Sequence, residues 1–286
     1  MRLVIFGAGG YIGRRLADKF RQMGVDVICY SSASSEAFDI KTGILSDNVT
    51  IPPGTDCVIY LSQSPFYRQM PEMASHLWGV NVVSAIKAAE LARHAGTLHF
   101  IYASTGNVYS FSFSPLREDD PVRRNDWYAL SKVHAEEVLA LYGKDMAVSI
   151  ARIFGVYGPG QTDKLVPNLI RSVRSGVPVK LAPSIGNDQD GGGLKISLCY
   201  IDDALDIFSG MLGRPGAGIV NVAGPEVLSI RDIAQSIGAG LGMENKFEVS
   251  DQPRTFDLIA DTTKLINLFS LTFTPFAEGI RRTLEG

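Results

Sequence analysis

Short apolar runs alternate with longer segments of mixed polarity along the first half of the chain. The four consecutive apolar residues Leu3 to Phe6 predict a buried strand, and the segment from Tyr11 to Met23, which Gly24 closes, predicts a helix. Further strands are predicted at Val25–Tyr30, Asp56–Leu61, Leu98–Ala103 and Ala147–Ile153, with helices at Met73–Ala95 and about Asp126–Tyr142. This alternation predicts an α/β fold in which helices cover both faces of a doubly wound parallel sheet.

The regular alternation of short apolar runs and longer segments of mixed polarity ends after Ile153. A turn-rich passage at 155–160 leads into a predicted helix at about 165–175, and the glycine-rich stretch 182–194 predicts a loop. These elements predict a smaller C-terminal α/β lobe that closes over the strand ends. The predicted first domain covers 1–154, with about 195–215 returning to it, and the predicted lobe covers 155–194 and 216–286.

Three glycines follow the first predicted strand and open the first predicted helix. Gly7 permits a sharp turn, Gly10 lets the backbone approach a pyrophosphate, and Gly13 lets helix and strand pack closely. The free N–H groups and the positive dipole end of the helix then suit a diphosphate. An ordinary strand-turn-helix is the alternative, but the position after a strand favours a Rossmann-like dinucleotide site that also includes Tyr11 and Ile12.

Candidate catalytic groups lie on a predicted helix and at the end of a predicted strand. Tyr128 and Lys132 are four residues apart and therefore share one helix face. We expect the ammonium to lower the pKa of the phenol toward working pH, which makes it a general acid/base for a carbinol–carbonyl pair. Ser104 and Thr105 end an apolar strand, where a hydroxyl can donate to the substrate oxygen or simply cap a turn.

Several further motifs follow the glycine turn along the chain. They are Asp39-Ile40, Asn81-Val82, Ser104-Thr105, Tyr128-x-x-x-Lys132, the run from Arg152 to Gly160, Tyr200 to Asp203, and Asn221 to Gly224. With the glycine turn, they resemble the NAD-dependent epimerase/dehydratase family of extended short-chain dehydrogenases/reductases, which act on nucleotide-activated sugars. The resemblance runs essentially from end to end.

The resemblance implies roles for individual residues. Thr105, Tyr128 and Lys132 would be catalytic, and Lys164, Arg254 and Asp257 would bind the nucleotide part of the substrate. Asp39 and Ile40 would contact adenine, and Asn81 and Phe154 the nicotinamide half. The complete predicted cofactor set is Gly7, Gly10, Tyr11, Ile12, Gly13, Ser31, Ser32, Asp39, Ile40, Leu61, Asn81, Tyr128, Lys132 and Phe154.

The chain departs from the family pattern at informative positions. Gly106-Asn107 stand where the sugar dehydratases carry an acidic pair, so dehydration is not expected, and Gly155 replaces an asparagine that helps bind the sugar diphosphate. At the end of the second strand, Ser31 and Ser32 stand where an acidic residue would repel a 2′-phosphate. This favours NADP(H) over NAD.

Composition narrows the classes of partner. A net charge of −3 predicts neither a nucleic-acid nor a membrane partner, and no apolar run approaches the ~20 residues of a membrane span. The apolar surroundings of the three cysteines predict buried, reduced thiols, and with no signal-peptide pattern the chain is expected in the cytoplasm. The four histidines lack metal-ligand spacing, so no metal is predicted. The resemblance also suggests a homodimer through helices 73–95 and 126–142.

Three functions are consistent with the sequence. The first is reduction of a 4-keto nucleotide sugar by hydride transfer, with Tyr128 as acid and Thr105 orienting the oxygen. The second is a C4 epimerase that uses the same residues with tightly held NAD. The third is a regulatory protein that binds NAD(P) without turnover, because a fold by itself does not establish a function.

Overall fold

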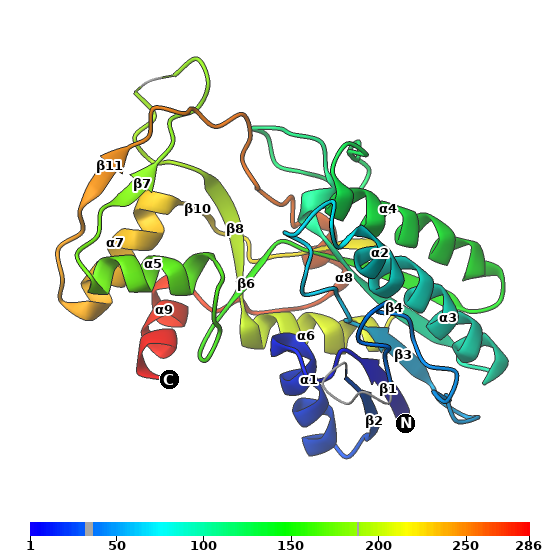
Figure 1. The fold of residues 1–286 in the computed structure, drawn as a ribbon. Helices are drawn as coiled ribbons and strands as arrows, with labels where there is room; N and C mark the ends of the chain where they lie inside the picture. The colour runs from blue at the N-terminus through cyan, green and yellow to red at the C-terminus, as the bar shows by residue number, and fades with distance from the viewer. Residues whose placement is uncertain (32–36, 188) are drawn as a thin grey trace. The chain divides into compact units, whose positions relative to one another are not determined.

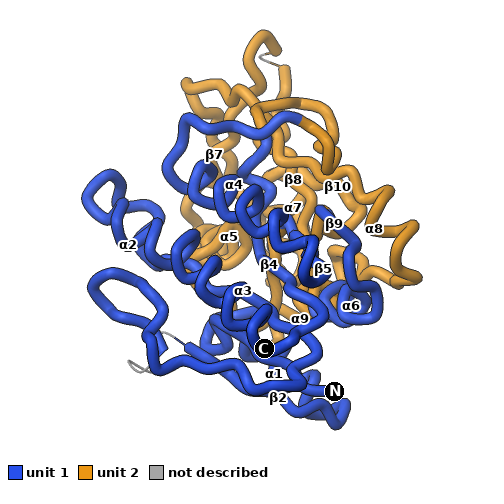
Figure 2. The backbone as a smooth tube through the Cα atoms, turned by 90° about the vertical axis from the view of Figure 1, so that its right-hand side faces the viewer, with its two compact units in different colours: residues 1–109, 121–152, 205–220 blue, residues 110–120, 153–204, 221–286 orange. Residues whose placement is uncertain are grey.

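The computed structural model describes residues 1–31, 37–187 and 189–286, which form two compact units (Figure 2). The first unit comprises residues 1–109, 121–152 and 205–220. The second comprises residues 110–120, 153–204 and 221–286. The chain therefore crosses between the units several times, and each unit is described by itself below.

The central sheet has six strands in the order β2-β1-β3-β4-β5-β9 (Figure 1). They are β1 (Arg2–Phe6), β2 (Asp26–Tyr30), β3 (Cys57–Tyr60), β4 (His99–Thr105), β5 (Ala147–Ile153) and β9 (Gly218–Val222). Strand β1 pairs in parallel with both β2 and β3, and β3 pairs in parallel with β4. The predicted α/β fold with a parallel sheet is confirmed.

Helices pack on the sheet because its strands are apolar on both faces. The helices beside it in Figure 1 are α1 (Tyr11–Gln22), α2 (Ala74–Trp78), α3 (Ser84–His94), α4 (Trp127–Ala140) and α6 (Ile201–Leu212). Val4 and Phe6 belong to one core cluster with the alanines of α3, while the alternate residues Leu3 and Ile5 are equally buried. Small alanine side chains let α3 lie close to the strands. Asp126 caps α4 by accepting from the backbone N–H of Ala129 at 2.8 Å.

The helix predicted over 73–95 is confirmed as one helical run over residues 74–94, but its middle is π-helical rather than α-helical. A π-helical segment, Gly79–Val83, separates α2 from α3. The hydroxyl of Tyr60 donates to the carbonyl of Val80 at 2.6 Å, and that of Tyr102 donates to the carbonyl of Asn81 at 3.0 Å. These hydroxyls from β3 and β4 take carbonyls that a regular helix would bond internally, which explains the local widening.

The second unit contains two smaller sheets and four helices in its described part. Strands β10 (Val227–Ser229), β8 (Lys195–Tyr200) and β6 (Gly155–Tyr157) form one sheet in that order, and β11 (Phe247–Val249) pairs with β7 (Val179–Leu181). The helices are α5 (Leu165–Arg174), α7 (Ile230–Leu241), α8 (Thr263–Leu268) and α9 (Phe276–Glu285). Ser229 and Asp232 form a capping box at the start of α7. The described part of 182–194 has no strand or helix, only bridges at Ser184 and Asn187.

Candidate active site

The turn between β1 and α1 requires glycine at two of the predicted positions. Gly7 has a φ of +83°, and a Cβ there would lie 2.7 Å from the backbone nitrogen of Ser62. A Cβ on Gly13 would lie 2.3 Å from the carbonyl oxygen of Gly7. The close packing of helix against strand that the sequence predicts for Gly13 is therefore present.

The N-terminus of α1 suits an anion. Among the described residues, no side chain caps this end, and the first turn contains no acidic residue. The backbone N–H groups of the first helical turn and the positive dipole end therefore suit a pyrophosphate at this position. Backbone without Cβ atoms at Gly7 and Gly10 leaves room for it, so these residues fit a dinucleotide.

A cavity of about 440 Å³ lies beside this turn, within the first unit. Its lining includes Gly7, Gly10, Ser31, Asp39, Ile40 and Leu61, so the structure brings these six predicted residues together. Ser32 was also predicted, but it lies outside the described residues. The volume is within the ordinary range for a small-molecule site.

Asp39 is fixed by the turn that follows it. Its carboxylate oxygen Oδ1 accepts from the backbone N–H of Thr42 at 2.7 Å, the Thr42 hydroxyl at 2.8 Å and the Lys41 N–H at 3.0 Å. These hydrogen bonds, with those from Thr42 foremost, lower the pKa of Asp39. The cavity therefore carries a fixed negative charge at the position where adenine contact is predicted.

Tyr128 lies in the first turn of α4, with Thr105 and Gln63 at its hydroxyl. The phenol donates to the Gln63 side-chain oxygen Oε1 at 2.9 Å, and Thr105 hydrogen-bonds the phenolic oxygen. Burial raises the pKa of Tyr128, which the contact with Thr105 only partly offsets. The predicted pair of phenol and strand-end hydroxyl is thus brought together, but the expected lowering of the phenol pKa is wrong because burial raises this pKa.

Lys132 is buried one turn further along α4. Its Nζ donates to the carbonyl oxygen of Ala103 at 2.8 Å and lies 4.7 Å from the centroid of the Tyr102 ring. Burial lowers the pKa of Lys132 to about 7, although the charge of Glu136 opposes this shift. The ammonium therefore gains or loses its proton near neutral pH.

A buried ion pair beneath Lys132 was not predicted from the sequence. Glu136 accepts two hydrogen bonds from Arg152 Nε, at 3.1 and 3.2 Å, and one from Arg152 Nη2 at 2.6 Å. Ser104 donates to the same carboxylate. Glu136 follows Lys132 by four residues, so the i, i+4 spacing that singled out Tyr128 and Lys132 also reaches it. Gln63 was missed as well, and its position just beyond β3 was the available signal.

Asn81 is fully buried in the π-helical segment. Its amide nitrogen donates to the hydroxyl of Ser131 at 3.0 Å, and its amide oxygen accepts from the N–H of Ser64 at 3.3 Å. The side chain therefore ties α4 to the segment after β3. Its predicted contact with the nicotinamide half stays a prediction.

The predicted substrate residues lie in the second unit, as does Phe154. Arg254 is buried: its Nε donates to Asp257 Oδ1 at 2.8 Å, its Nη1 donates to the carbonyl of Ala182 at 2.9 Å, and its Nη2 pairs with Asp190. The predicted Arg254 and Asp257 pair is thus a bonded unit. Lys164 is the N-terminal cap residue of α5, and Phe154 is buried beside Val222.

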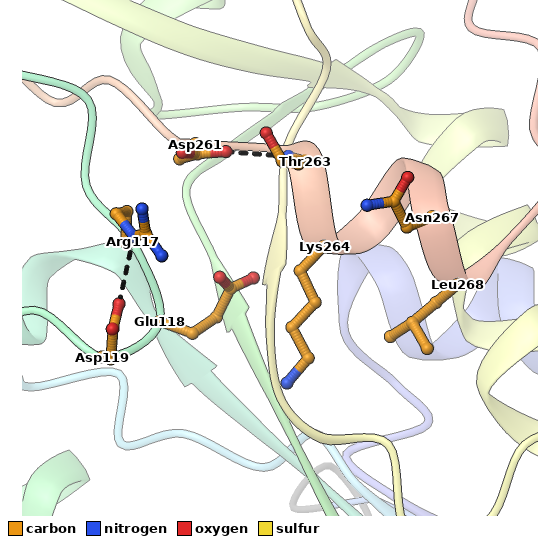
Figure 3. A pocket seen from close by; sticks show the side chains of 8 residues that line it. All are labelled: Arg117, Glu118, Asp119, Asp261, Thr263, Lys264, Asn267 and Leu268. Atoms are coloured by element: carbon orange, nitrogen blue, oxygen red, sulfur yellow. Dashed lines mark hydrogen bonds and ion pairs between the residues drawn. The ribbon is translucent and has the colours of Figure 1, made fainter.

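A second cavity lies in the second unit beside α8 (Figure 3). Arg117 forms an ion pair with Asp119 at 3.3 Å on one side, and Asp261 accepts from the N–H of Thr263 at 2.8 Å on the other. Charges of both signs thus line it. Among its described lining residues there is no predicted site residue.

Comparison with known proteins identifies the family. The model for the NAD dependent epimerase/dehydratase family matches residues 3–223. The chain belongs to this family. Its members are enzymes of the extended short-chain dehydrogenase/reductase type, so the resemblance seen in the sequence and the expectation of an enzyme are confirmed. The non-catalytic alternative finds no support in this result.

Individual relatives of this chain are named for different reactions. The UDP-glucose 4-epimerase of Mycolicibacterium smegmatis is 26% identical over 100% of this chain and 98% of its own. The dTDP-4-dehydro-6-deoxyglucose reductase of Escherichia coli is 28% identical over 82% of this chain and 80% of its own. The structure of the Thermus thermophilus UDP-glucose 4-epimerase in complex with NAD shares the fold, with a TM-score of 0.79 and 22% identity over 100% of this chain and 98% of that one.

None of the described helices is long and apolar enough to cross a bilayer. Among the same residues, no group of three or more His, Cys, Asp or Glu side chains is arranged to hold a metal ion.

Proposed function

We propose that this protein reduces a 4-keto nucleotide sugar by hydride transfer, with Tyr128 as the proton donor. The observation that carries the proposal is the state of the phenol: its hydrogen is directed to Gln63 Oε1 and burial raises its pKa. The resting group is therefore an acid, and reduction of a carbonyl consumes a proton at oxygen. The likeness to the Escherichia coli reductase supports the same direction.

Three residues of this chain would have separate roles in the protonation of the substrate oxygen. Tyr128 gives its proton to that oxygen, and Thr105, held by the Asn107 N–H at 3.2 Å, orients it. Lys132, when protonated, stabilises the tyrosinate that remains. A bound nicotinamide supplies the hydride for the carbonyl carbon. We assign the dinucleotide to the first unit through the cavity beside Gly7.

We propose NAD(H) as the cofactor. The expectation of NADP(H), which rested on Ser31 and Ser32, finds no support, since the solved epimerases with a named dinucleotide are complexes with NAD. Ser31 lines the cavity, and a Cβ on Gly9 would lie 2.3 Å from its hydroxyl.

A nucleotide-sugar C4 epimerase is the second candidate. It is favoured by the likeness to 4-epimerases along the whole length of the chain. The same Thr105, Tyr128 and Lys132 would serve, with the phenol returning its proton after each half-reaction. Gly106-Asn107 stand where the sugar dehydratases carry an acidic pair, so dehydration is the reaction of the family that this site suits least.

We assign nucleotide binding to Lys164, Arg254 and Asp257 in the second unit, with a restriction. Because Arg254 is already bonded to Asp257, Asp190 and Ala182, it would act mainly by fixing the local backbone. Lys164, at the start of α5, would then provide the direct contact with a diphosphate.

The experiment measures cofactor stoichiometry. The purified protein is incubated with dTDP-4-keto-6-deoxyglucose and either NADH or NADPH, and separately with UDP-glucose and no added nicotinamide. A reductase consumes one reduced cofactor for each carbinol formed, and faster with NADH. Interconversion of UDP-glucose and UDP-galactose without added cofactor would instead establish the epimerase. Turnover of neither substrate class by the intact chain would contradict both candidates.

A further inference from the structure

Gln63, which was not among the predicted site residues, is the partner of the Tyr128 hydroxyl. It lies three residues beyond the end of β3, it lines the cavity beside the glycine turn, and its Oε1 is 2.9 Å from the phenolic oxygen. The residue is exposed, so its amide is accessible from that cavity. The acid/base group and the nucleotide cavity therefore share this one side chain.

The hydrogen bonds around the phenol run in one direction. The backbone N–H of Asn107 donates to the hydroxyl oxygen of Thr105 at 3.2 Å, and Thr105 hydrogen-bonds the phenolic oxygen. A phenol has a single hydrogen, and here Tyr128 donates it to Gln63. The transferable proton therefore points at the amide oxygen of Gln63, which occupies the place of an acceptor.

We propose that Gln63 is a positioning residue that keeps the Tyr128 hydroxyl protonated and aimed until the substrate oxygen replaces the amide as its acceptor. The inference rests on the proposed reduction. In that step the O–H bond of Tyr128 breaks and its proton bonds to the carbonyl oxygen. A hydride from a reduced nicotinamide bonds to the carbonyl carbon, the product is a carbinol, and the tyrosinate regains a proton from solvent.

The physical basis is selective stabilisation of one protonation state. In the orientation shown, the carboxamide oxygen of Gln63 accepts from the neutral phenol and repels the phenolate, which has no hydrogen to give. To donate to a phenolate, the amide would have to give up this bond and turn its NH2 group toward Tyr128. Other groups also face the phenol from the neighbouring elements: Tyr67 and Tyr102, Asp126 at the start of α4, and Lys132 on α4 itself. A substitution at Gln63 leaves all four in place, so its effect on the proton can be isolated.

The first test is independent of turnover. The protein is prepared with 3-fluorotyrosine, and the fluorine resonance of Tyr128 is assigned by its loss in Tyr128→Phe. We expect Gln63→Leu to lower the pKa of this phenol by about half a unit to one unit, as for the loss of one neutral hydrogen bond. Gln63→Glu places a negative charge there and raises it. Gln69→Leu is the matched control, since Gln69 is an exposed glutamine of the same segment, and it leaves the resonance unchanged.

The second test is the pH profile of reduction. The alkaline limb, where the acid form of Tyr128 is lost, moves to lower pH in Gln63→Leu and to higher pH in Gln63→Glu, by the shifts seen in the fluorine titration. An unmoved phenol titration in both variants overturns the role of Gln63. If the unmodified protein reduces no 4-keto sugar, the proposed function fails, and the titration still decides whether Gln63 holds the proton.

Discussion

The buried ion pair between Glu136 and Arg152 allows a quantitative prediction about the support of the site. The side chains are only 6% and 5% exposed, and three hydrogen bonds join them. Removal of one partner leaves the other charge buried without compensation, which costs about 3–5 kcal/mol. We therefore expect Glu136→Met and Arg152→Met each to lower the free energy of unfolding by about this amount.

The double variant distinguishes this explanation from a simple loss of contacts. With both members of the pair replaced by apolar side chains, neither Glu136 nor Arg152 is left buried without its partner, so the double variant should cost less than either single substitution. Ser104 loses its carboxylate acceptor in both Glu136 variants, and this contributes about 1–3 kcal/mol that the second substitution does not recover. Because the double variant is expected to cost less than either single loss of about 3–5 kcal/mol, the expected coupling energy is about 3 kcal/mol or more, in favour of the double variant.

Urea unfolding followed by tryptophan fluorescence measures these free energies. The two tryptophans of the chain, Trp78 and Trp127, both lie in the first unit, as does the ion pair, so the signal reports the unit that is perturbed. Additive effects of the two single substitutions would refute the reasoning. Single losses under about 1 kcal/mol would also do so, because a pair of that strength behaves as one exposed to solvent.

Three further outcomes follow from the same geometry. Gly13→Ala places a Cβ 2.3 Å from the Gly7 carbonyl oxygen. This substitution should lower the free energy of unfolding in urea by about 1–3 kcal/mol and weaken NAD binding in calorimetry. The control Gly143→Ala, whose Cβ would lie in open space, should change the free energy of unfolding by under about 0.5 kcal/mol. Tyr128→Phe should abolish turnover and leave the NAD affinity within a few-fold; retained turnover would remove the phenol from the mechanism. Burial lowers the pKa of Lys132 to about 7, against about 10.4 unfolded, so between these values the unfolded state binds more protons and stability rises with pH. Lys132→Met should remove this rise, and parallel stability curves for the two proteins would contradict the shift.

Local features of the fold could be predicted because they depend on neighbouring residues. The β1–α1 turn was identified from Gly7, Gly10 and Gly13, whose roles are set by the turn itself and by the strand and helix that it joins. The π-helical segment at 79–83 could not be predicted in this way. It depends on Tyr60 and Tyr102, which approach from β3 and β4 and are distant in sequence.

The candidate site shows the same difference between local features, which could be predicted, and contacts between residues distant in sequence, which could not. Thr105 and Tyr128 were expected to meet, since one ends a strand of the sheet and the other opens a helix packed on it, and they do. The direction of the phenol's pKa was predicted wrongly, because helical spacing reports that Lys132 is near but not that burial raises the pKa of Tyr128. Likewise, the bonding of Arg254 to Asp190 depends on a contact across 64 residues.

The arrangement of α4 explains why charged groups are buried under the site at all. Tyr128, Lys132 and Glu136 follow one another at four-residue intervals, and each bonds a different residue of the segment 103–105 at the end of β4. A shift of α4 by one turn would break all three contacts and leave Glu136 and Arg152 unpaired in the interior. The cost of such a shift fixes one register between helix and strand. We infer that the ion pair holds Tyr128 at the height of Thr105, and that its main contribution is to position the acid.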